Sequence, residues 1–425
     1  MQTETGECIT YQELLERALA AAGGLSSRGI KPGDPVVLEG ARTLQFAVEL
    51  HAALLCGAVA VPLDGRLSAK ERAQRAVSRG SLTAGTVTAL FTSGTTAAPK
   101  PVHLSGSNWE ANAVGSALAL GLDPDERWLC TMPLAHVGGL AILLRSTFYA
   151  TTVVLHEHFD TAAVLAELMA ERAAVTLVSL VPTMLERLLD AGLTHPPSLR
   201  WALLGGGPIS PSLLHRAKEA DVPVAPTYGM TEGCSQIATF GFPLHGVSLR
   251  IEAGEVLARG PNFAGNRLDA DGWLRTGDLG ELDQRGRLRI VGRRADTIVT
   301  GGENVAPAEV EAVLSEHPAV AEAGVFARPD PQWGERVVAA VVLRDGYQGE
   351  GDLRSGPQPE QASGSQAGGQ DGCQPARLES QRIDPEELRA FVRERLAAFK
   401  VPKEIEVVQA LPRTASGKLL RRELH

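Results

Sequence analysis

The sequence predicts an α/β protein in which a large N-terminal domain of helix-covered mixed sheets precedes a small, mobile α+β domain. Three observations support this prediction. The chain has 425 residues, strand-like and helix-like segments alternate up to about residue 250, and sequence rich in Gly, Asp and Arg follows. A chain of this length is too long for one hydrophobic core, so two or three domains are expected. We place the domains at 1–294 and 295–425.

The first domain is expected to begin with a helix over about residues 10–22, because Thr10 and Glu13 have the spacing of a capping box. Strand-like apolar runs and helix-like segments then alternate, which is typical of a mixed or parallel sheet covered by helices. The expected strands are 36–38, 175–181, 199–204 and 222–226, and the expected helices are 160–173, a helix starting at Pro182, and 210–220. Ligands bind beyond the carboxyl ends of such strands, where residues 205–208 and 227–232 fall.

The second domain is expected to contain helices over 307–316 and 385–399. Its expected strands are 320–327, 335–343 and 404–409. Residues 346–382 differ from the rest because they are poor in apolar residues and rich in Gly, Gln, Ser and Pro. This composition predicts a disordered insert. A neutral insertion is favoured over a partner-binding segment, since a long surface loop adds little closure entropy.

Charge and cysteine content exclude several classes of function. The net charge is −9 without a basic block, so a nucleic-acid partner is not expected. The five cysteines are scattered and never form C-x-x-C, which fits reduced thiols in a cytoplasm and offers no zinc site. No apolar run is long enough to span a membrane. The His156-Glu157-His158 segment lacks further ligands, so a strand end or surface loop is favoured there. Homo-oligomerisation is left open.

The most informative segment follows the apolar run that ends at Phe91. Its polar residues are Thr92, Ser93, Gly94, Thr95, Thr96 and Lys100. Hydroxyls, backbone N–H groups and a cation are the groups that bind a triphosphate. The segment is not a P-loop, because Pro99 stands where that motif has its second glycine. For this segment alone, a polar surface turn is an equally good interpretation.

Six further motifs follow in order. They lie at residues 132–139, 205–208, 228–232, 275–278, 292–304 and 412–418. With these seven motifs the chain resembles the adenylate-forming superfamily of acyl- and aryl-CoA synthetases, luciferases and peptide-synthetase adenylation domains. The resemblance runs from about residue 10 to 422, apart from the insert. It implies that ATP adenylates a carboxylate, releasing pyrophosphate, and that a thiol, usually that of CoA, then takes the acyl group.

The resemblance implies roles in ATP binding. Residues 92–100 would wrap the β- and γ-phosphates, and Thr231 would contact the α-phosphate. Glu232 would hold Mg²⁺ as a hard oxygen ligand. Tyr228 and the backbone of Gly205, Gly206 and Gly207 would pack on adenine. Asp278 would accept hydrogen bonds from the ribose hydroxyls, and Arg293 would contact the ribose or a phosphate.

Lys418 would be the main cation of the adenylation transition state, brought to the site by domain closure. Each residue also has a purely structural interpretation. Asp278 would then be a turn former, Arg293 a solvated surface residue and Lys418 part of a basic tail. The order of the seven motifs favours the catalytic interpretation.

Two positions depart from the family pattern. Ala97 stands where the family usually has glycine, which leaves the ATP affinity open, because alanine is strained at positive φ. Ala295 stands at the interdomain pivot, where many relatives have Asp or Lys. A hinge needs only to absorb backbone rotation, so we expect the domain switch to be retained.

Within the superfamily, the chain most resembles the o-succinylbenzoate–CoA ligases of menaquinone biosynthesis. The resemblance lies in the short sequence between Leu63 and Thr92, in residues 136–145 and in residues 228–236. The substrate of these ligases is a diacid, so its second carboxylate must meet a cation or ordered water. Arg145 is the candidate cation; the alternative is an arginine that reaches solvent from a helix end.

His136 is expected to line or gate the acyl pocket, because a carboxylate substrate needs no base at neutral pH. Ser235 and Gln236 are expected to line the same pocket. Three other functions remain open: a different aryl- or acyl-CoA synthetase, an adenylation enzyme that loads a carrier protein, and a nucleotide-binding protein that kept the fold without catalysis.

Overall fold

The computed structural model of the chain describes residues 1–92, 99–171, 174–349, 381–413 and 419–424. They form two compact units, Met1–Ile290 and Val291–His425. The sequence analysis placed the division after residue 294. Among the described residues, none of the helices is both long and apolar enough to cross a membrane.

A mixed sheet of eight strands forms the centre of the first unit, in the order β1-β7-β6-β8-β9-β10-β11-β12. The strands are parallel from β1 to β10, and β11 and β12 are added antiparallel. The sheet consists of β1 (Gln2–Thr3), β6 (Arg127–Cys130), β7 (Thr152–Leu155), β8 (Leu177–Leu180), β9 (Trp201–Leu204), β10 (Val224–Met230), β11 (Ser235–Thr239) and β12 (Phe242–Pro243). The prediction of a helix-covered mixed sheet is confirmed.

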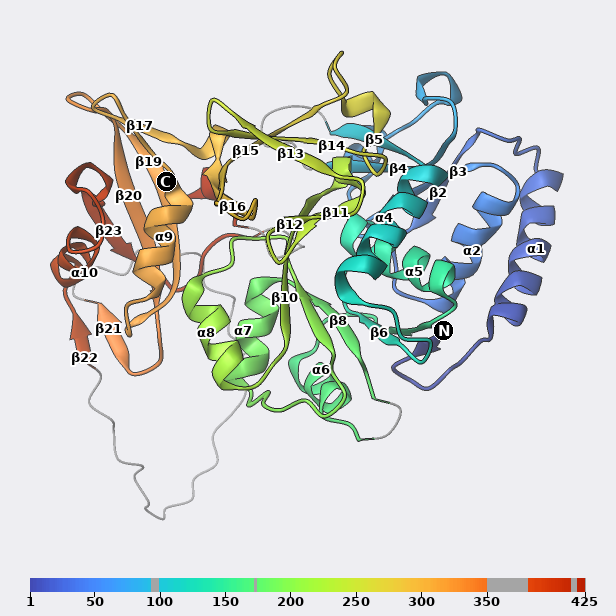
Figure 1. Cartoon of the computed structure of the whole chain (residues 1–425), viewed down its shortest axis with the longest axis horizontal. Helices are drawn as coiled ribbons and strands as arrows, with labels where there is room; N and C mark the ends of the chain where they lie inside the picture. The colour runs from blue at the N-terminus through green and yellow to red at the C-terminus, as the bar shows by residue number, and fades with distance from the viewer. Residues whose placement is uncertain (93–98, 172–173, 350–380, 414–418, 425) are drawn as a thin grey trace, which may run out of the picture. The chain divides into compact units, whose positions relative to one another are not determined.

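Three helices pack beside this sheet and beside one another (Figure 1): α6 (Thr161–Leu168), α7 (Pro182–Asp190) and α8 (Pro211–Glu219). Proline occupies the first turn of α7 and of α8, where its missing N–H leaves no unpaired donor. Leu185 and Leu213 are among the apolar residues that these helices bury in the shared core. The helix predicted over 160–173 is shorter in the structure, where α6 ends at Leu168.

A second sheet has the order β2-β3-β4-β5, with bounds β2 (Pro35–Glu39), β3 (Val59–Leu63), β4 (Thr86–Thr92) and β5 (Lys100–Ser105). Helix α2 (Leu44–Leu55) packs on β2 and β3, and α1 (Tyr11–Ser27) packs on α2 (Figure 1). Thr10 and Glu13 form the predicted capping box, but α1 continues five residues beyond residue 22, to Ser27. The short α3 (Ala69–Ala73) and η1 (Arg79–Ser81) connect β3 to β4.

Helices α4 (Gly106–Leu120) and α5 (Val137–Tyr149) pack on each other and bury a large apolar core. Both also contact β11 of the central sheet. The first unit is completed by a four-stranded sheet in the order β13-β14-β15-β16. Its strands are β13 (Ser248–Glu252), β14 (Glu255–Arg259), β15 (Leu274–Leu282) and β16 (Leu288–Arg293), and β16 continues past residue 290. The 3₁₀ turn η3 (Gly265–Arg267) lies between β14 and β15 in the sequence.

In the second unit, a five-stranded sheet carries α9 (Pro307–Ser315) and α10 (Pro385–Arg393). The strands are β17 (Ile298–Thr300), β18 (Glu303–Val305), β19 (Val320–Asp330), β20 (Gly334–Leu343) and β23 (Glu404–Val407), and the short helices are η4 (Arg294–Asp296), η5 (Ala398–Lys400) and η6 (Arg421–Glu423). The predicted helix over 385–399 is too long. The chain leaves α10 after Arg393, and Leu396 and Phe399 pack against the core of this unit.

The predicted disordered insert over 346–382 is wrong at both ends. β21 (Tyr347–Gly349) and β22 (Gln381–Ile383) pair in parallel. Ile383 is buried and Tyr347 packs against the same core, so each end of the segment is anchored by an apolar side chain. Residues 350–380 lie outside the described part of the chain.

Candidate nucleotide and acyl site

The phosphate-binding segment connects two adjacent strands of the first unit. Thr92 is the last residue of β4 and Lys100 the first of β5, and the two are paired in the antiparallel register. Both strands lie beside the 3₁₀ turn η2 (Thr231–Gly233), which carries Thr231 and Glu232. The strands that bound the predicted phosphate loop therefore lie beside the turn that carries the predicted magnesium ligand. Ser93, Gly94, Thr95, Thr96 and Ala97 lie outside the described residues.

The predicted adenine-binding glycines lie where β9 ends against β10. Gly205 follows β9, and its N–H donates a hydrogen bond to the Leu180 carbonyl (3.1 Å). A Cβ at this position would lie 2.7 Å from Cγ2 and 2.9 Å from the carbonyl oxygen of Thr227, so only glycine allows this close approach. Gly206 has a φ of +79°, and Gly207 follows it. The glycine backbone thus lies beside Thr227, the residue before Tyr228.

Tyr228 and Asp278, which are separated by 50 residues, form a direct hydrogen bond. The Tyr228 hydroxyl donates to Oδ2 of Asp278 at 2.7 Å, and only 4% of Asp278 is exposed. Oγ1 of Thr276 accepts from the Asp278 N–H (3.1 Å), and Oε1 of Glu255 accepts from the Gly277 N–H (3.0 Å). A carboxylate fixed in this way can accept hydrogen bonds from a ribose in a defined direction.

The turn that carries Thr231 and Glu232 depends on an irregularity between β10 and β11. The register shifts between Tyr228 and Gly229. A Cβ on Gly229 would lie 1.8 Å from the Ser235 carbonyl oxygen, so no other residue fits there without rearrangement. Cys234 and Ser235 both have positive φ, +55° and +91°. Backbone strain of this kind gathers at functional sites.

Glu232 lies beside one cation. Its Oε1 is 3.5 Å from Nη2 of Arg267, and 15% of the Glu232 side chain is exposed. No group of three or more His, Cys, Asp or Glu that could hold a metal occurs within the described residues. Mg²⁺ is commonly bound through one or two carboxylates together with substrate phosphates, so a single carboxylate beside the phosphate loop fits this ion.

Arg145 is fully inside the protein, with 2% of the residue exposed. The interpretation of an arginine that reaches solvent is therefore wrong. Nε and Nη2 both donate to Oδ1 of Asn112, the former at 3.2 Å, and the guanidinium lies 5.7 Å from the centre of the Trp128 ring. Desolvation lowers the pKa of Arg145. Within the described residues, no carboxylate forms an ion pair with it.

Arg145 is linked to a second predicted acyl-site residue. Asn112 donates from Nδ2 to the Gln236 carbonyl (2.9 Å), so Arg145, Asn112 and Gln236 form one buried chain of hydrogen bonds. The Gln236 amide donates to Thr239 (2.8 Å), while its Oε1 is buried and accepts no hydrogen bond from any described residue. Ser235, its neighbour, is half-buried.

His136 is the N-cap residue of α5 and is half-buried. Burial lowers its pKa, and of the nearby charges Asp64 raises it and Arg66 lowers it further. A pKa below the ordinary 6.5 leaves the imidazole neutral at pH 7. Arg145 lies nine positions further along the sequence, which corresponds to about 13 Å along a helix. His136 thus caps the N-terminus of α5, whereas Arg145 lies in its C-terminal half, four residues before the last residue, Tyr149.

Arg293 and Lys418 belong to the second unit. Arg293 is exposed at the end of β16, and its carbonyl accepts a hydrogen bond from Thr297 (3.3 Å). Lys418 lies outside the described residues. On either side of it, Arg413 and Leu419 form a bridge. Arg421 pairs with Glu311 (2.6 Å) and Asp296 (2.9 Å), which anchors the chain three residues beyond Lys418.

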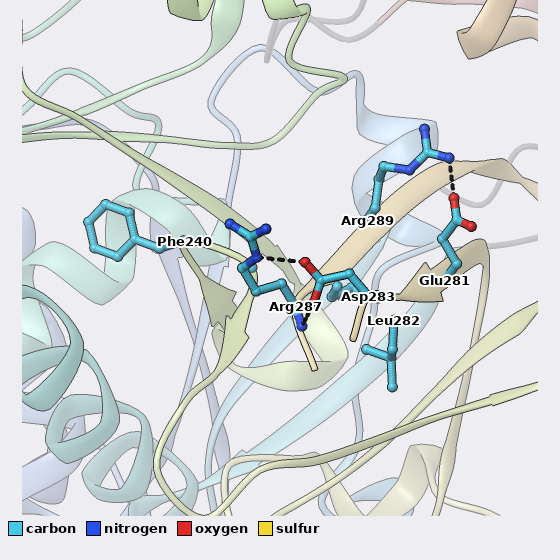
Figure 2. A pocket seen from close by; sticks show the side chains of 8 residues that line it. Phe240, Glu281, Leu282, Asp283, Arg287 and Arg289 are labelled. Carbon is cyan, nitrogen blue, oxygen red and sulfur yellow. Dashed lines mark hydrogen bonds and ion pairs between the residues drawn. The ribbon is translucent and has the colours of Figure 1, made fainter. Parts of the chain in front are cut away.

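A surface cavity of about 480 Å³ lies elsewhere in the first unit (Figure 2). Asp283 pairs with Arg287 (2.7 Å) and Glu281 with Arg289 along its wall, which also includes Phe240. These charges neutralise each other in pairs. None of the residues predicted to bind nucleotide or acid lines this cavity, so we do not assign the substrate to it.

The sequence analysis missed three residues that contact predicted site residues: Asn112, Glu255 and Arg267. Each belongs to a segment with no motif of its own, and each meets its partner across a long stretch of sequence. Only Arg267 had a signal in the sequence. It lies in the polar segment 265–267, which forms a turn between the short strands after residue 250.

Comparison with known proteins identifies the family to which the chain belongs. The model of the AMP-binding enzyme family matches residues 2–81 and 83–265, and that of the AMP-binding enzyme C-terminal domain matches residues 309–357 and 372–418. A 2-succinylbenzoate–CoA ligase from Bacillus licheniformis is 36% identical, over 98% of this chain and 94% of that protein.

Solved structures agree with this similarity. The o-succinylbenzoate CoA synthetase from Bacillus subtilis in complex with the acyl-adenylate intermediate OSB-AMP has a TM-score of 0.82 at 33% identity, over 98% of this chain and 93% of that chain. The same protein in complex with ATP and magnesium ion has a TM-score of 0.81 at 33% identity, over 98% and 94%. The adenylate-forming fold expected from the motifs is confirmed, and the chain belongs to the AMP-binding enzyme family.

Proposed function

We propose that this chain is an ATP- and Mg²⁺-dependent 2-succinylbenzoate–CoA ligase of menaquinone biosynthesis. The observation that carries the proposal is its similarity to curated 2-succinylbenzoate–CoA ligases, which spans 98% of the chain at 35–36% identity. A match limited to the nucleotide motifs would support only the reaction class. A match over nearly the whole chain also covers the segments that surround the acyl substrate.

The reaction proceeds in two displacements. In the first, a carboxylate oxygen of the acid attacks the α-phosphorus of ATP, and pyrophosphate leaves to give acyl-AMP. In the second, the CoA sulfur attacks the acyl carbon, and AMP leaves as the thioester forms. The first step depends on positioning and charge stabilisation. Tyr228 and Asp278 orient the nucleoside, and Thr231 and the loop that ends at Lys100 hold the phosphates.

Glu232 would bind Mg²⁺, together with phosphate oxygens of ATP. When bound, the ion neutralises the charge that develops on the departing pyrophosphate. Glu232 is suited to this because its turn lies beside both strands that bound the phosphate loop and its side chain is partly exposed. His136, being neutral, would line the acyl site without repelling or neutralising the reacting carboxylate.

Arg145 would interact with the second carboxylate of the diacid. A buried guanidinium without a carboxylate partner among the described residues gains most from a ligand anion, because its charge is otherwise compensated only by an amide oxygen and a tryptophan ring. Gln236, whose Oε1 lacks a donor among those residues, and Ser235 would line the same part of the site.

Lys418 would stabilise the adenylation transition state. Lys418→Ala is then expected to lower acyl-AMP formation by about 100-fold or more, the usual effect of removing a transition-state contact. Thioester formation from supplied acyl-AMP and CoA should be retained. The two half-reactions are measured separately, and an equal loss in both would contradict this role.

We further infer a cytoplasmic location. The support comes from the cysteines: Cys8, Cys56, Cys130 and Cys234 are all free thiols, as expected in a reducing compartment. Assembly into homo-oligomers stays a prediction from the sequence analysis.

The function is tested by incubating the protein with ATP, Mg²⁺, CoA and a mixture of carboxylic acids that includes 2-succinylbenzoate. Mass spectrometry should detect 2-succinylbenzoyl-CoA as the dominant thioester, with an equal amount of AMP. A different dominant thioester would retain the mechanism and refute the substrate. AMP without any thioester would point to a carrier protein as acceptor, and no AMP would refute catalysis.

A further inference from the structure

Arg267 lies at the phosphate end of the nucleotide site, although no motif includes it. It ends the 3₁₀ turn η3, and its Nη2 is 3.5 Å from Oε1 of Glu232. The pair is partly buried, with 28% of the arginine side chain and 15% of the glutamate side chain exposed. A cation therefore already occupies the carboxylate to which the family resemblance assigns Mg²⁺.

The guanidinium of Arg267 is incompletely satisfied. Its Nε is buried and has no hydrogen-bond partner among the described residues. A buried N–H without an acceptor is unfavourable, and more so when it belongs to a charged group. The side chain thus has a free donor next to the carboxylate it pairs with. An anion with several acceptor oxygens would satisfy it.

The turn η3 is fixed to the strand that leaves the phosphate loop. Oδ1 of Asn266 accepts from the His103 N–H (3.1 Å), and Nδ2 of Asn266 donates to the Pro101 carbonyl (3.1 Å). On its other side, the Ala264 N–H donates to the Glu232 carbonyl (2.9 Å). These bonds hold Arg267 between β5, which starts at Lys100, and the turn that carries Glu232.

Mg²⁺ and Arg267 would compete for the negative charge of the Glu232 carboxylate, and the divalent ion attracts that charge more strongly. When Mg²⁺ binds the carboxylate together with ATP, Arg267 loses its anionic partner while remaining partly buried. An arginine in that position binds phosphate oxygens strongly, through parallel N–H donors. The phosphates of ATP that accompany the metal would then offer anionic oxygens to the freed guanidinium.

We propose that Arg267 is a phosphate-binding residue that is held by Glu232 in the empty enzyme and released to the phosphates of ATP when Mg²⁺ takes that carboxylate. This inference rests on the proposed function for its substrate, ATP with Mg²⁺. Metal binding and the arginine–phosphate contact are then coupled, because each requires the Glu232–Arg267 pair to open.

The coupling is tested by isothermal titration calorimetry of ATP binding, in excess Mg²⁺ and in EDTA, for wild type and Arg267→Gln. The variant should bind ATP about 10-fold more weakly in Mg²⁺ and within about 2-fold of wild type in EDTA, since the contact forms only after the metal arrives. Arg267→Lys keeps the charge and loses the paired donors. Its affinity for ATP in Mg²⁺ should therefore lie between that of wild type and that of Arg267→Gln.

Arg259→Gln serves as the matched control, because Arg259 is an exposed arginine at the end of β14 and stacks on Trp273. It should leave ATP binding unchanged in both conditions. If Arg267→Gln weakens ATP binding equally in Mg²⁺ and in EDTA, the residue has a structural role and the inference is overturned. The inference is also overturned if the variant binds ATP in Mg²⁺ as tightly as wild type does. If Arg267→Gln does not fold, Arg267→Lys carries the same comparison. If wild type does not bind ATP in Mg²⁺, the proposed function itself fails.

Discussion

Single residues in this site are defined by their buried polar partners. Asp278 and Arg145 both lie inside the first unit, with 4% and 2% of each residue exposed. Their environments differ. Asp278 accepts a hydrogen bond from Tyr228, whereas Arg145 is matched by an amide oxygen of Asn112. The carboxylate is fixed by the protein itself, while the arginine retains a charge that a ligand anion would balance.

Tyr228→Phe removes the O–H donor to Asp278 and keeps the ring. A hydrogen bond to a charged group contributes about 1.5–3 kcal/mol, so we expect the KM for ATP to rise roughly 10-fold or more. Steady-state kinetics with varied ATP test this. Tyr11→Phe is the control, because the Tyr11 hydroxyl has the Ser146 and Thr151 carbonyls of the same unit within hydrogen-bond distance, and there the KM for ATP should not change.

Arg145→Met tests the second-carboxylate site without leaving a large cavity. Replacing a buried charge by an apolar side chain of similar volume is often neutral for stability, so the variant should fold. Its KM for 2-succinylbenzoate should rise about 10-fold or more, and its KM for an aromatic monoacid should change little. Kinetics with both acids decide the point. Equal changes for the two acids would indicate a structural role for Arg145.

At the scale of elements, the site depends on places where regular structure is interrupted. The register shift between β10 and β11 turns the chain into η2, and the turn η3 connects β5 to Glu232. Gly229 permits the first interruption, because the Ser235 carbonyl occupies the space of its Cβ. The positive φ of Ser235 is a second feature of the same turn.

Gly229→Ala is therefore expected to destabilise the protein severely, by about 3 kcal/mol or more, since the added methyl group cannot be accommodated without moving the backbone. Activity should be lost together with stability. Thermal denaturation and the acyl-CoA assay measure both effects. Gly23→Ala is the matched control: it lies in α1 with open space around it, so it should stabilise the protein by about 0.5–1 kcal/mol.

At the scale of the whole molecule, buried and half-buried histidines make stability depend on pH. Burial lowers the pKa values of His51, His103, His136 and His317 below their ordinary 6.5. The unfolded chain then binds these protons at higher pH than the folded chain does. The free energy of unfolding therefore falls as the pH decreases through about 6.5.

We expect the thermal denaturation midpoints to be lower at about pH 5.5 than at about pH 7.5, and the fall to be smaller in His103→Gln. His103 suits this test because its Nδ1 accepts from the Thr83 N–H (3.3 Å), a bond that protonation removes. Calorimetry at several pH values provides the measurement. Midpoints that are constant or that rise toward acid would contradict the lowered pKa values.

The sequence by itself determined the reaction class, the mixed-sheet fold and the order of the nucleotide motifs. Local patterns were sufficient for these features, because a capping box, a glycine turn or the tyrosine–glutamate motif is completed within a few residues. The start of α1 at its capping box and of α7 at Pro182 are examples. Where packing against the core overrode local preference, at the end of α10 and at the ends of the insert, the predicted boundaries were wrong.

Only the tertiary structure decided which distant residues share the site. Tyr228 and Asp278 are 50 residues apart, and Arg145 and Asn112 are 33 apart. The pairing of Glu232 with Arg267 likewise depends on how β5, η2 and η3 pack. Nothing in the sequence near either partner specifies such contacts, because they arise when separate elements bury their apolar faces together and their polar side chains must find partners inside.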